Sequence, residues 1–466
     1  MLDNTARNRL TAAIAAGISS FLTPFMSSSI NIALPALSQE LHLNAIALGW
    51  VANISLLSAG IFLVPFGKMA DIVGRKRIFT LGLSLYSVAS LLGMIAHNPG
   101  LLLIARFLQG MGGAMVFGTG VAILTSVYPP AEKGLALGIN TALVYTGLSV
   151  GPFLGGIVTQ HLTWRAIFAL NLPLSLGALL IVLFGLKGEW AEARGEKFDL
   201  IGSLIYGTGL LLLMFGFTLL PKGYAVLLIG TGLLAVVGFV IWELKLTNPV
   251  FPFRLFRGNL IFTFSNLAAL INYAATAAVG FLLSLYLQYI KGLTPQSTGL
   301  LLVSQPVVMA LFSPLAGRFS DRIQPRLIAS IGMAISTLGL FLFSFLTTTT
   351  DLRLLIAGLV LVGLGFALFS APNTNAVMAA VGSRHYGIAS ATLGTMRLLG
   401  QMFSLGLAQM LIALFVGPVR LSTTNHTGLI LTVRVAFIIF SALCGAGILA
   451  SLARGKVNAG AGTVAG

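Results

Sequence analysis

Long apolar runs, separated by short polar segments, recur along the whole chain of 466 residues. Each run is long enough to cross roughly 30 Å of hydrocarbon as an α-helix. A backbone in lipid must satisfy its own hydrogen bonds, which favours helices. The pattern therefore predicts an all-α membrane protein with fourteen transmembrane helices, over residues 10–33, 45–66, 78–96, 101–127, 135–159, 164–186, 200–220, 224–242, 260–290, 298–316, 327–346, 352–380, 387–414 and 427–452.

The composition agrees with this prediction, because 57% of the residues are hydrophobic and only 8% are charged. A net charge of +16 could indicate nucleic-acid binding, but the basic residues follow membrane topology. With both termini in the cytoplasm, nineteen of the 27 Lys and Arg residues fall in cytoplasmic segments and only five in external ones. This is the positive-inside pattern. We therefore expect the lipid bilayer as a partner, and no nucleic acid.

The chain is predicted to be duplicated. A glycine, a basic residue, two further residues and an aspartate follow the second span as Gly67 to Asp71, and recur 250 residues later as Gly317 to Asp321. Two parallel six-helix halves are typical of secondary transporters, with the substrate site between them. The predicted domains are an N-terminal six-helix bundle (1–186), a cytoplasmic linker (187–199), two inserted helices (200–243), a second cytoplasmic linker (244–259) and a C-terminal six-helix bundle (260–466).

The loop after the second predicted span reads GKMADIVGRKR, residues 67–77. Its glycines allow a tight turn, and its aspartate can pair with an arginine or with helix N-termini. A plain positive-inside loop is the alternative, which the spacing and the partial repeat at 317–322 disfavour. We predict a cytoplasmic gate formed by Gly67, Asp71, Gly74, Arg75, Arg77, Gly317, Asp321 and Arg322.

This loop resembles the G-x-L-A-D-x-x-G-R-K signature of the major facilitator superfamily. Within the fourth predicted span, RFLQG at 106–110 is similar to the R-x-x-Q-G motif of that family. In the fifth, GLSVGPFLGG at 147–156 is similar to the glycine motif of its drug:proton antiporters. WRAIFALNLP at 164–173 and RLLGQ at 397–401 resemble the fourteen-helix antiporter branch. The resemblance implies multidrug efflux across the plasma membrane by alternating access, with protons as the coupling ion.

The glycine motif has a physical interpretation of its own. Gly147, Gly151 and Gly155 form a flat stripe that lets another helix approach closely. Pro152 removes an internal hydrogen bond, and Gly156 extends the motif. Generic small-residue packing is the alternative. We favour a hinge between the halves, because hinges gather small and helix-breaking residues.

The end of the first span, FMSSSINIALP at 25–35, departs from this branch, whose usual pattern is L-D-x-T-I-x-N-x-A-L-P. Aligned on Asn31, the chain has Met26 at the Asp position and Ser28 at the Thr position. That acid would be the natural proton carrier and the natural partner of cationic drugs. All eleven acids and all five histidines fall in loops or at span ends, so the sequence offers no buried substitute.

Polar residues in the first and fourth spans are candidates for a substrate cavity. Ser27, Ser28 and Asn31 share one helix face, as do Arg106 and Gln109. One hypothesis is that the two faces meet at a matching depth and line a cavity. The alternative is that the serines bond back to carbonyl groups of their own helix. The sequence does not decide between the two.

In the second half, Arg397 is predicted near the bilayer middle, where its charge cannot easily reach water, whereas Arg434 can snorkel outward. The polar patch SAPNTN at 370–375 lines the cavity or forms interhelical hydrogen bonds, with a slight preference for the latter. The remaining cavity candidates are Asn266, Tyr273, Asn373 and Asn375.

We therefore expect a monomeric secondary transporter, not an enzyme, that exports amphiphilic or hydrophobic small molecules. No cofactor is expected, and the lone Cys444 gives no metal site. An acid-free cavity with arginines favours neutral, zwitterionic or anionic substrates. The alternatives are an uncoupled facilitator, an anion or lipid transporter, and a membrane sensor without transport. The loop and hinge motifs argue against the sensor, because a protein that does not move needs no hinge.

Overall fold

The computed structural model describes residues 4–320, 322–381, 386–421 and 426–455. Fourteen helices within these ranges are long and apolar enough to span a membrane, which confirms the predicted number. The helices are α1 (Asn4–Leu41), α2 (Ala45–Val73), α3 (Arg75–Met94), α4 (Pro99–Val127), α5 (Pro130–His161), α6 (Arg165–Gly185), α7 (Leu200–Leu219), α8 (Gly223–Lys245), η1 (Phe253–Phe256), α9 (Leu260–Thr276), α10 (Val279–Leu285), η2 (Tyr286–Ile290), α11 (Pro295–Leu302), α12 (Ser304–Ser320), α13 (Pro325–Phe343), α14 (Leu352–Ala379), α15 (Tyr386–Phe415) and α16 (His426–Ala453).

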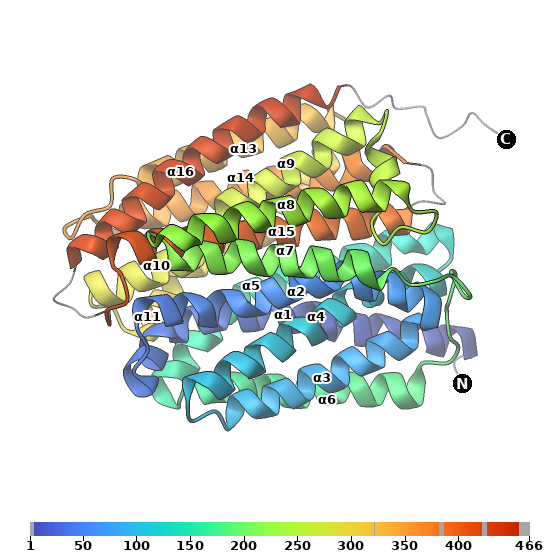
Figure 1. The fold of residues 1–466 in the computed structure, drawn as a ribbon, viewed down its shortest axis with the longest axis horizontal. Helices are drawn as coiled ribbons and strands as arrows, with labels where there is room; N and C mark the ends of the chain where they lie inside the picture. Colours follow the sequence, from blue (N-terminus) through green and yellow to red (C-terminus); the bar gives the residue numbers. More distant parts are fainter. Residues whose placement is uncertain (1–3, 321, 382–385, 422–425, 456–466) are drawn as a thin grey trace.

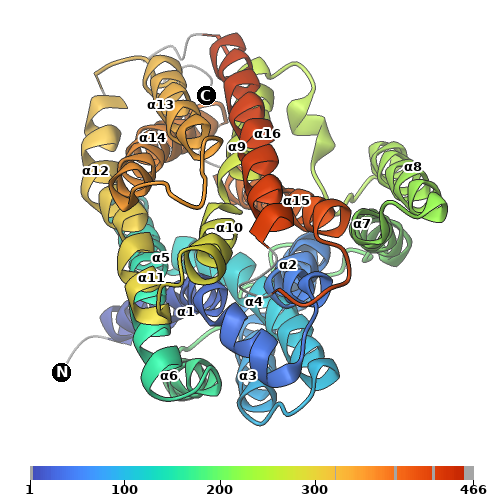
Figure 2. The same cartoon turned by 90° about the vertical axis from the view of Figure 1, so that its left-hand side faces the viewer.

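Two of the spans are built from more than one helix. α9, α10 and the π-helix η2 together form the ninth span, and α11 with α12 forms the tenth. Helices α1–α6 pack into one bundle and α9–α16 into another. The inserted pair α7 and α8 stands at one side, where α7 contacts α2 and α15 (Figure 2). α1 begins and α16 ends at the same end of the molecule, as an even number of spans requires (Figure 1).

The two bundles repeat one glycine contact, which supports the duplication. In the N-terminal bundle, a Cβ at Gly112 of α4 would lie 2.8 Å from the carbonyl oxygen of Gly82 on α3. At the equivalent contact of α13 and α14, a Cβ at Gly332 would lie 2.5 Å from the carbonyl oxygen of Gly365. Both helix pairs therefore approach so closely that only glycine fits between their backbones.

The bundles are joined mainly at their extracellular ends. Ser284 on α10 donates from Oγ to the carbonyl oxygen of Asn31 (2.7 Å), and the amide nitrogen of Ala45 donates to the carbonyl oxygen of Val419 (2.9 Å). Within the described ranges, the hydrogen bonds between the bundles lie in the outer halves of the helices, apart from one at mid-depth described below. This end of the molecule is therefore closed.

Replacement of Gly332 by valine tests the close helix contact. The new side chain would meet the α14 backbone, and we expect a cost of about 1–3 kcal/mol from overpacking, seen as a lower melting temperature of the purified protein. Gly230→Val on α8, where a Cβ meets nothing within 4 Å, is the matched control. Equal melting temperatures for the two variants would contradict the packing described.

Candidate functional site

A polar cluster lies at mid-depth where the two bundles meet. Arg397 of α15 donates from Nη2 to Thr374 Oγ1 on α14 (2.6 Å), and its guanidinium carbon lies 5.7 Å from the centre of the Tyr273 ring on α9. From the other bundle, the hydroxyl of Tyr145 on α5 shares a hydrogen bond with Ser370 Oγ on α14 (3.1 Å). We call these five residues the Arg397 cluster. It brings one cation, two phenol rings and two hydroxyl groups together.

Close packing fixes the Tyr273 ring in this cluster. A Cβ at Gly400 of α15 would lie 2.5 Å from the carbonyl oxygen of Leu270 and 2.8 Å from Tyr273 Cβ, so glycine is needed for this approach. Tyr273 also meets Phe366 of α14 edge to face, with ring centres 5.1 Å apart, a favoured arrangement of aromatic rings. Sequence analysis identified Tyr273 and Arg397 but missed Tyr145, because nothing in the sequence shows which way α5 turns that residue.

The hydrogen-bonding capacity of Arg397 is only partly used. Its Nε is buried without an acceptor, and none of the ion pairs among the described residues includes it. An arginine offers five N–H donors, and leaving a charge without a counter-charge in a low-dielectric region is costly. The cluster is therefore suited to an oxygen-rich group that is neutral or negative, with aromatic surface beside it.

Arg106 lies inside the N-terminal bundle and is 1% exposed. It donates to the carbonyl oxygen of Val51 (3.3 Å) and to Ser55 Oγ (2.7 Å) on α2, and to Gln109 Oε1 on α4 (2.8 Å). These bonds point to α2, so the hypothesis that Arg106 faces the polar groups of α1 is not supported. α2 is the nearer helix because Gly110 of α4 lies directly against the Ser55 backbone.

Met26, at the position of the missing acid, is buried in a neutral pocket. Its Sδ accepts a hydrogen bond from Asn171 Nδ2 on α6 (3.3 Å), and Asn171 Oδ1 accepts one from the Tyr86 hydroxyl on α3 (3.4 Å). Met26 is 1% exposed. A thioether is a weak acceptor without charge, so this pocket holds a packing contact where the related branch would hold a carboxylate.

Two of the α1 serines form hydrogen bonds with backbone carbonyl groups of α1 and α5. Ser28 Oγ donates back to the carbonyl oxygen of Pro24 (2.8 Å), as the alternative hypothesis expected, and lies 3.4 Å from that of Gly147. Ser29 Oγ donates to the carbonyl oxygen of Gly151 (2.9 Å). These hydroxyl groups therefore serve helix packing.

Ser27 and Asn31 differ from the neighbouring serines. Both are partly exposed, and neither side chain has a hydrogen-bond partner among the residues that the structure describes. Asn31 lies at the contact between α1 and α10, where a Cβ at Gly280 would lie 3.9 Å from its Nδ2. These two side chains keep their polar groups free and stay candidates for substrate contact.

The asparagines of the C-terminal bundle are largely used in packing. Asn266 is fully buried and donates to the carbonyl oxygen of Phe262 (2.9 Å). Asn373 donates to the carbonyl oxygen of Ser265 (3.1 Å) and accepts from Arg454 Nη1 (2.9 Å). Asn266 therefore bonds back to its own helix, whereas Asn373 joins α14 to α9 and to Arg454 after α16, which agrees with the preference for packing at 370–375.

Three further polar residues bind within the same bundle. Asn375 Nδ2 donates to Ser320 Oγ (2.6 Å) and so joins α14 to α12. Arg434 Nε donates to the carbonyl oxygen of Ser344 at the outer end of α13 (3.1 Å). Arg454, which the sequence suggested was a cytoplasmic charge, is 0% exposed. Its burial was missed because it lies just after the apolar run of α16.

The glycine motif of α5 contacts both bundles. The glycines that face α1 are Gly147, Gly151 and Gly155. Gly156 faces the other bundle, since a Cβ there would lie 2.6 Å from the carbonyl oxygen of Pro295 on α11. In the same contact, the Pro152 carbonyl group lies against Gly299. The motif is thus placed where movement between the bundles would act on α5.

The predicted loop 67–77 is mostly helical, since only Gly74 lies between α2 and α3. This junction is tied to residues 187–199, which we call the acidic linker. Arg75 donates from Nε to Asp71 Oδ1 (2.9 Å), and from Nη1 to Ser126 Oγ on α4 (2.7 Å) and Glu192 Oε1 (2.8 Å). Its guanidinium therefore joins α2, α4 and the linker.

Further ion pairs strengthen this connection. Lys68 Nζ lies 2.6 Å from Glu196 Oε2, and Arg77 Nε lies 3.8 Å from Glu189 Oε2. Single exposed pairs contribute little, but here several act on one segment. The acidic linker thus covers the basic junction of α2 and α3.

The glycines of the predicted gate differ in their roles. Gly74 has φ +128°, a conformation that strains other residues, and it allows the break between α2 and α3. A Cβ at Gly67 or Gly317 would meet nothing within 4 Å. In the second copy, the amide nitrogen of Arg322 donates to the carbonyl oxygen of Phe319. Asp321 lies outside the described residues, so its role stays a prediction.

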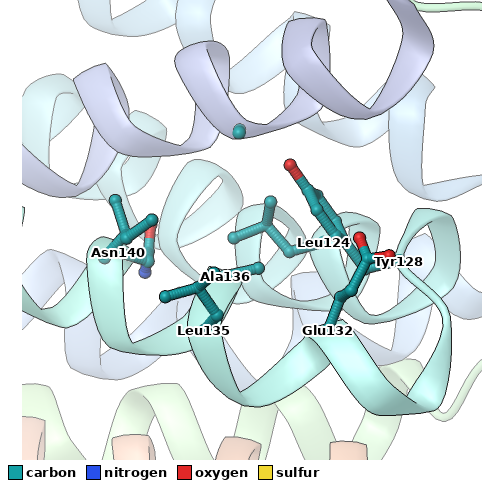
Figure 3. A pocket seen from close by; sticks show the side chains of 8 residues that line it. Leu124, Tyr128, Glu132, Leu135, Ala136 and Asn140 are labelled. Carbon is teal, nitrogen blue, oxygen red and sulfur yellow. The ribbon is translucent and has the colours of Figure 1, made fainter. Parts of the chain in front are cut away.

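A separate cavity of about 90 Å³ lies between α1, α4 and α5 near the cytoplasmic side. Figure 3 shows Asn140 at one end and Tyr128 with Glu132 at the other. At the latter end, Glu132 also pairs with Arg9 of α1 (3.4 Å). Its size suits a few water molecules. It lies within one bundle, away from the Arg397 cluster, and is lined by Ala13, Leu124, Tyr128, Glu132, Leu135, Ala136, Ile139 and Asn140.

Two facing bundles with a polar cluster at mid-depth define a transporter of small molecules. The chain belongs to the Major Facilitator Superfamily, whose family model matches residues 16–267 and 265–462. It is therefore a multi-pass protein of the plasma membrane, in a family of transporters rather than enzymes, whose members bind small-molecule substrates within the membrane.

Similar proteins include the riboflavin transporter RibZ of Clostridioides difficile, 31% identical over 83% of this chain and 84% of the relative. The cephamycin export protein CmcT of Amycolatopsis lactamdurans is 32% identical over 85% and 83%. The tetracenomycin C resistance and export protein of Streptomyces glaucescens is 27% identical over 81% and 70%. A solved bacterial homologue of the human lysosomal transporter Spinster, inward-facing and unoccupied, has the same fold, with a TM-score of 0.67, 15% identity and coverage of 96% and 97%.

Replacement of Arg397 by glutamine tests the Arg397 cluster. A hydrogen bond to a charged group contributes about 1.5–3 kcal/mol, so we expect the affinity for an anionic amphiphile to fall by about tenfold or more. The measurement is equilibrium binding to protein in lipid nanodiscs. Arg353→Gln, at the exposed outer end of α14, is the matched control. Unchanged affinity in Arg397→Gln would exclude this residue from the substrate site.

Replacement of Glu192 by glutamine tests the acidic linker. The variant removes one counter-charge of Arg75, and we expect trypsin to cut the linker at Arg194 up to several-fold faster, as an exposed pair contributes about 0.2–1 kcal/mol. Glu132→Gln breaks a different cytoplasmic ion pair, with Arg9, and serves as control. Identical cleavage rates for the wild type and Glu192→Gln would show that the pair does not hold the linker.

Proposed function

We propose that this protein exports neutral, zwitterionic or anionic amphiphilic small molecules by alternating access, and that the substrate binds at the Arg397 cluster. The observation that carries the proposal is the Arg397 guanidinium, which contacts Tyr273 and Thr374 and has no carboxylate partner in the described ranges. A cation in a low-dielectric site repels cationic ligands and attracts anionic or strongly dipolar ones.

The names of the relatives support an organic small molecule as cargo and outward transport as direction. Two of them are named for export, of cephamycin and of tetracenomycin C, and one for riboflavin transport. The free side chains of Ser27 and Asn31 would add polar contacts from α1. This chain supplies both bundles by itself, so we propose a monomer.

Movement is proposed between the bundles 1–186 and 260–466. The contact of Gly156 with Pro295, and of Pro152 with Gly299, lies between them on α5 and α11, and small residues permit such sliding or rocking. The closed extracellular end described above supplies one end state. The inserted helices 200–243 and the linkers 187–199 and 244–259 would follow this motion from the side.

The proposed energy source is the proton gradient, as in the antiporter branch that the sequence resembles. The route would differ from that branch, because Met26 leaves the α1 pocket without an acid. An uncoupled facilitator is the competing function, and the same absence of an acid in α1 favours it.

Transport into proteoliposomes with an internal pH dye tests the proposal. Matched cationic, neutral and anionic analogues of one amphiphile are compared. We expect transport of the neutral and anionic analogues, with proton movement in the opposite direction. Transport without proton movement would identify the facilitator, and transport of the cationic analogue alone would overturn the proposed substrate class.

Replacement of Met26 by aspartate tests the effect of the missing acid. The new carboxylate would lie beside Asn171 Nδ2, in the pocket that also holds Tyr86. We expect Met26→Asp to gain transport of the cationic analogue, because an intramembrane acid can pair with the cation. Met26→Asn has the same shape without the charge and should show no gain. An equal gain in both variants would assign the effect to polarity rather than to charge.

A further inference from the structure

Glu243, at the cytoplasmic end of α8, is buried although most of this helix is exposed. The residue is 1% exposed, whereas Leu227 and Leu234 on the same helix are 70% and 72% exposed. Glu243 Oε2 accepts a hydrogen bond from the amide nitrogen of Phe251 (3.0 Å). Its other oxygen, Oε1, is buried and has no donor among the described residues.

The carboxyl group of Asp199 lies beside this unpaired oxygen. Asp199 caps α7, with Oδ1 accepting from the amide nitrogen of Gly202 (3.0 Å) and Oδ2 accepting from Trp242 Nε1 (3.1 Å). A Cβ at Gly202 would overlap Asp199 Oδ2 and lie 3.0 Å from Glu243 Oε1. Because Gly202 has no side chain, the carboxyl groups of Asp199 and Glu243 can approach and interact with each other.

No hydrogen atom is available for a hydrogen bond between the Glu243 and Asp199 carboxyl groups when both are ionised. Both Asp199 oxygens already accept N–H donors, and an ionised carboxylate can only accept. Two ionised carboxylates so close together would repel each other, and a buried acceptor without a donor is costly. A proton on Glu243 Oε1 removes the repulsion and supplies a donor toward Asp199.

The charged and titratable groups on the elements around Glu243, apart from Asp199, are exposed or bonded to other partners. Lys245, the last residue of α8, is exposed, and Arg254 Nη2 on η1 donates to the carbonyl oxygen of Leu246 (3.0 Å). On α2, Lys68 pairs with Glu196. On α7, the Tyr206 hydroxyl donates to the carbonyl oxygen of Gly60. Asp199 is therefore the charged group that faces Glu243 in the described part of the chain.

We infer that Glu243 and Asp199 form a proton-binding site at the base of the inserted helices, in which one proton on Glu243 Oε1 is donated to the Asp199 carboxylate. The inference does not depend on the transport function. Phe251, which Glu243 holds, packs in an apolar cluster with Ile61 and Val64 of α2 and Met402 of α15. The proton therefore stabilises a contact between the linker after α8 and both bundles.

The infrared spectrum of the purified full-length protein tests for this proton. A protonated carboxyl group has a C=O stretching band of its own, apart from the bands of carboxylates and amides. We expect this band in the wild type at neutral pH and its loss in Glu243→Gln. Glu132→Gln, at an exposed acid, is the matched control and should retain it. A band that persists in Glu243→Gln would overturn the inference.

The pH dependence of stability gives a second readout. The folded wild type binds one more proton than the unfolded chain, so its melting temperature should fall as the pH rises from mildly acidic to mildly alkaline. Glu243→Gln, whose amide can donate to Asp199 as the protonated acid does, should fold and should lack this fall. Parallel pH profiles would contradict the inference, as would wild-type stability that responds to added Na⁺ or Ca²⁺ instead of to pH.

Discussion

Hydrocarbon offers no hydrogen-bond partner, so polar side chains within the spans must find theirs inside the protein. This constraint explains most of the polar residues. Ser29 donates to the α5 backbone, Arg106 to α2 and Gln109, and Asn373 joins Ser265 and Arg454. Glycines make these bonds possible by letting backbones approach. Among the described residues, Arg397 differs from these, because it lies at mid-depth and its buried Nε has no hydrogen-bond acceptor.

Much of the fold follows from the sequence because length and hydropathy determine what crosses a membrane. The fourteen spans could be predicted in this way, whereas the duplication is inferred from the repeated glycine–aspartate motif and the family from several sequence motifs. The site could be predicted only in part. Helix periodicity shows that Arg106 and Gln109 share a face, but it does not show which neighbouring helix that face meets. The choice of α2 over α1 depends on Gly110, whose contact with Ser55 exists only in the folded bundle.

The same limit applies to charged residues at helix ends. Glu243 and Arg454 lie where a sequence places solvated charges, yet they are 1% and 0% exposed. Burial there depends on the loop or helix that covers them, as Phe251 does for Glu243. The acidic linker is held at both ends, since Glu192 pairs with Arg75 at the start of α3 and Asp199 caps α7 beside Glu243. The acidic linker is therefore bonded to α3 near one end and begins α7 at the other.

The most direct test of the account is the charge preference of binding. Two analogues of one amphiphile, matched in size and shape but carrying opposite charges, are titrated against the wild-type protein in nanodiscs at low and high salt. The account predicts that the anionic analogue binds more tightly and that salt weakens this preference, because Arg397 lies at mid-depth and has no ion-pair partner among the described residues. Tighter binding of the cationic analogue would contradict it, and would require an acid at the site.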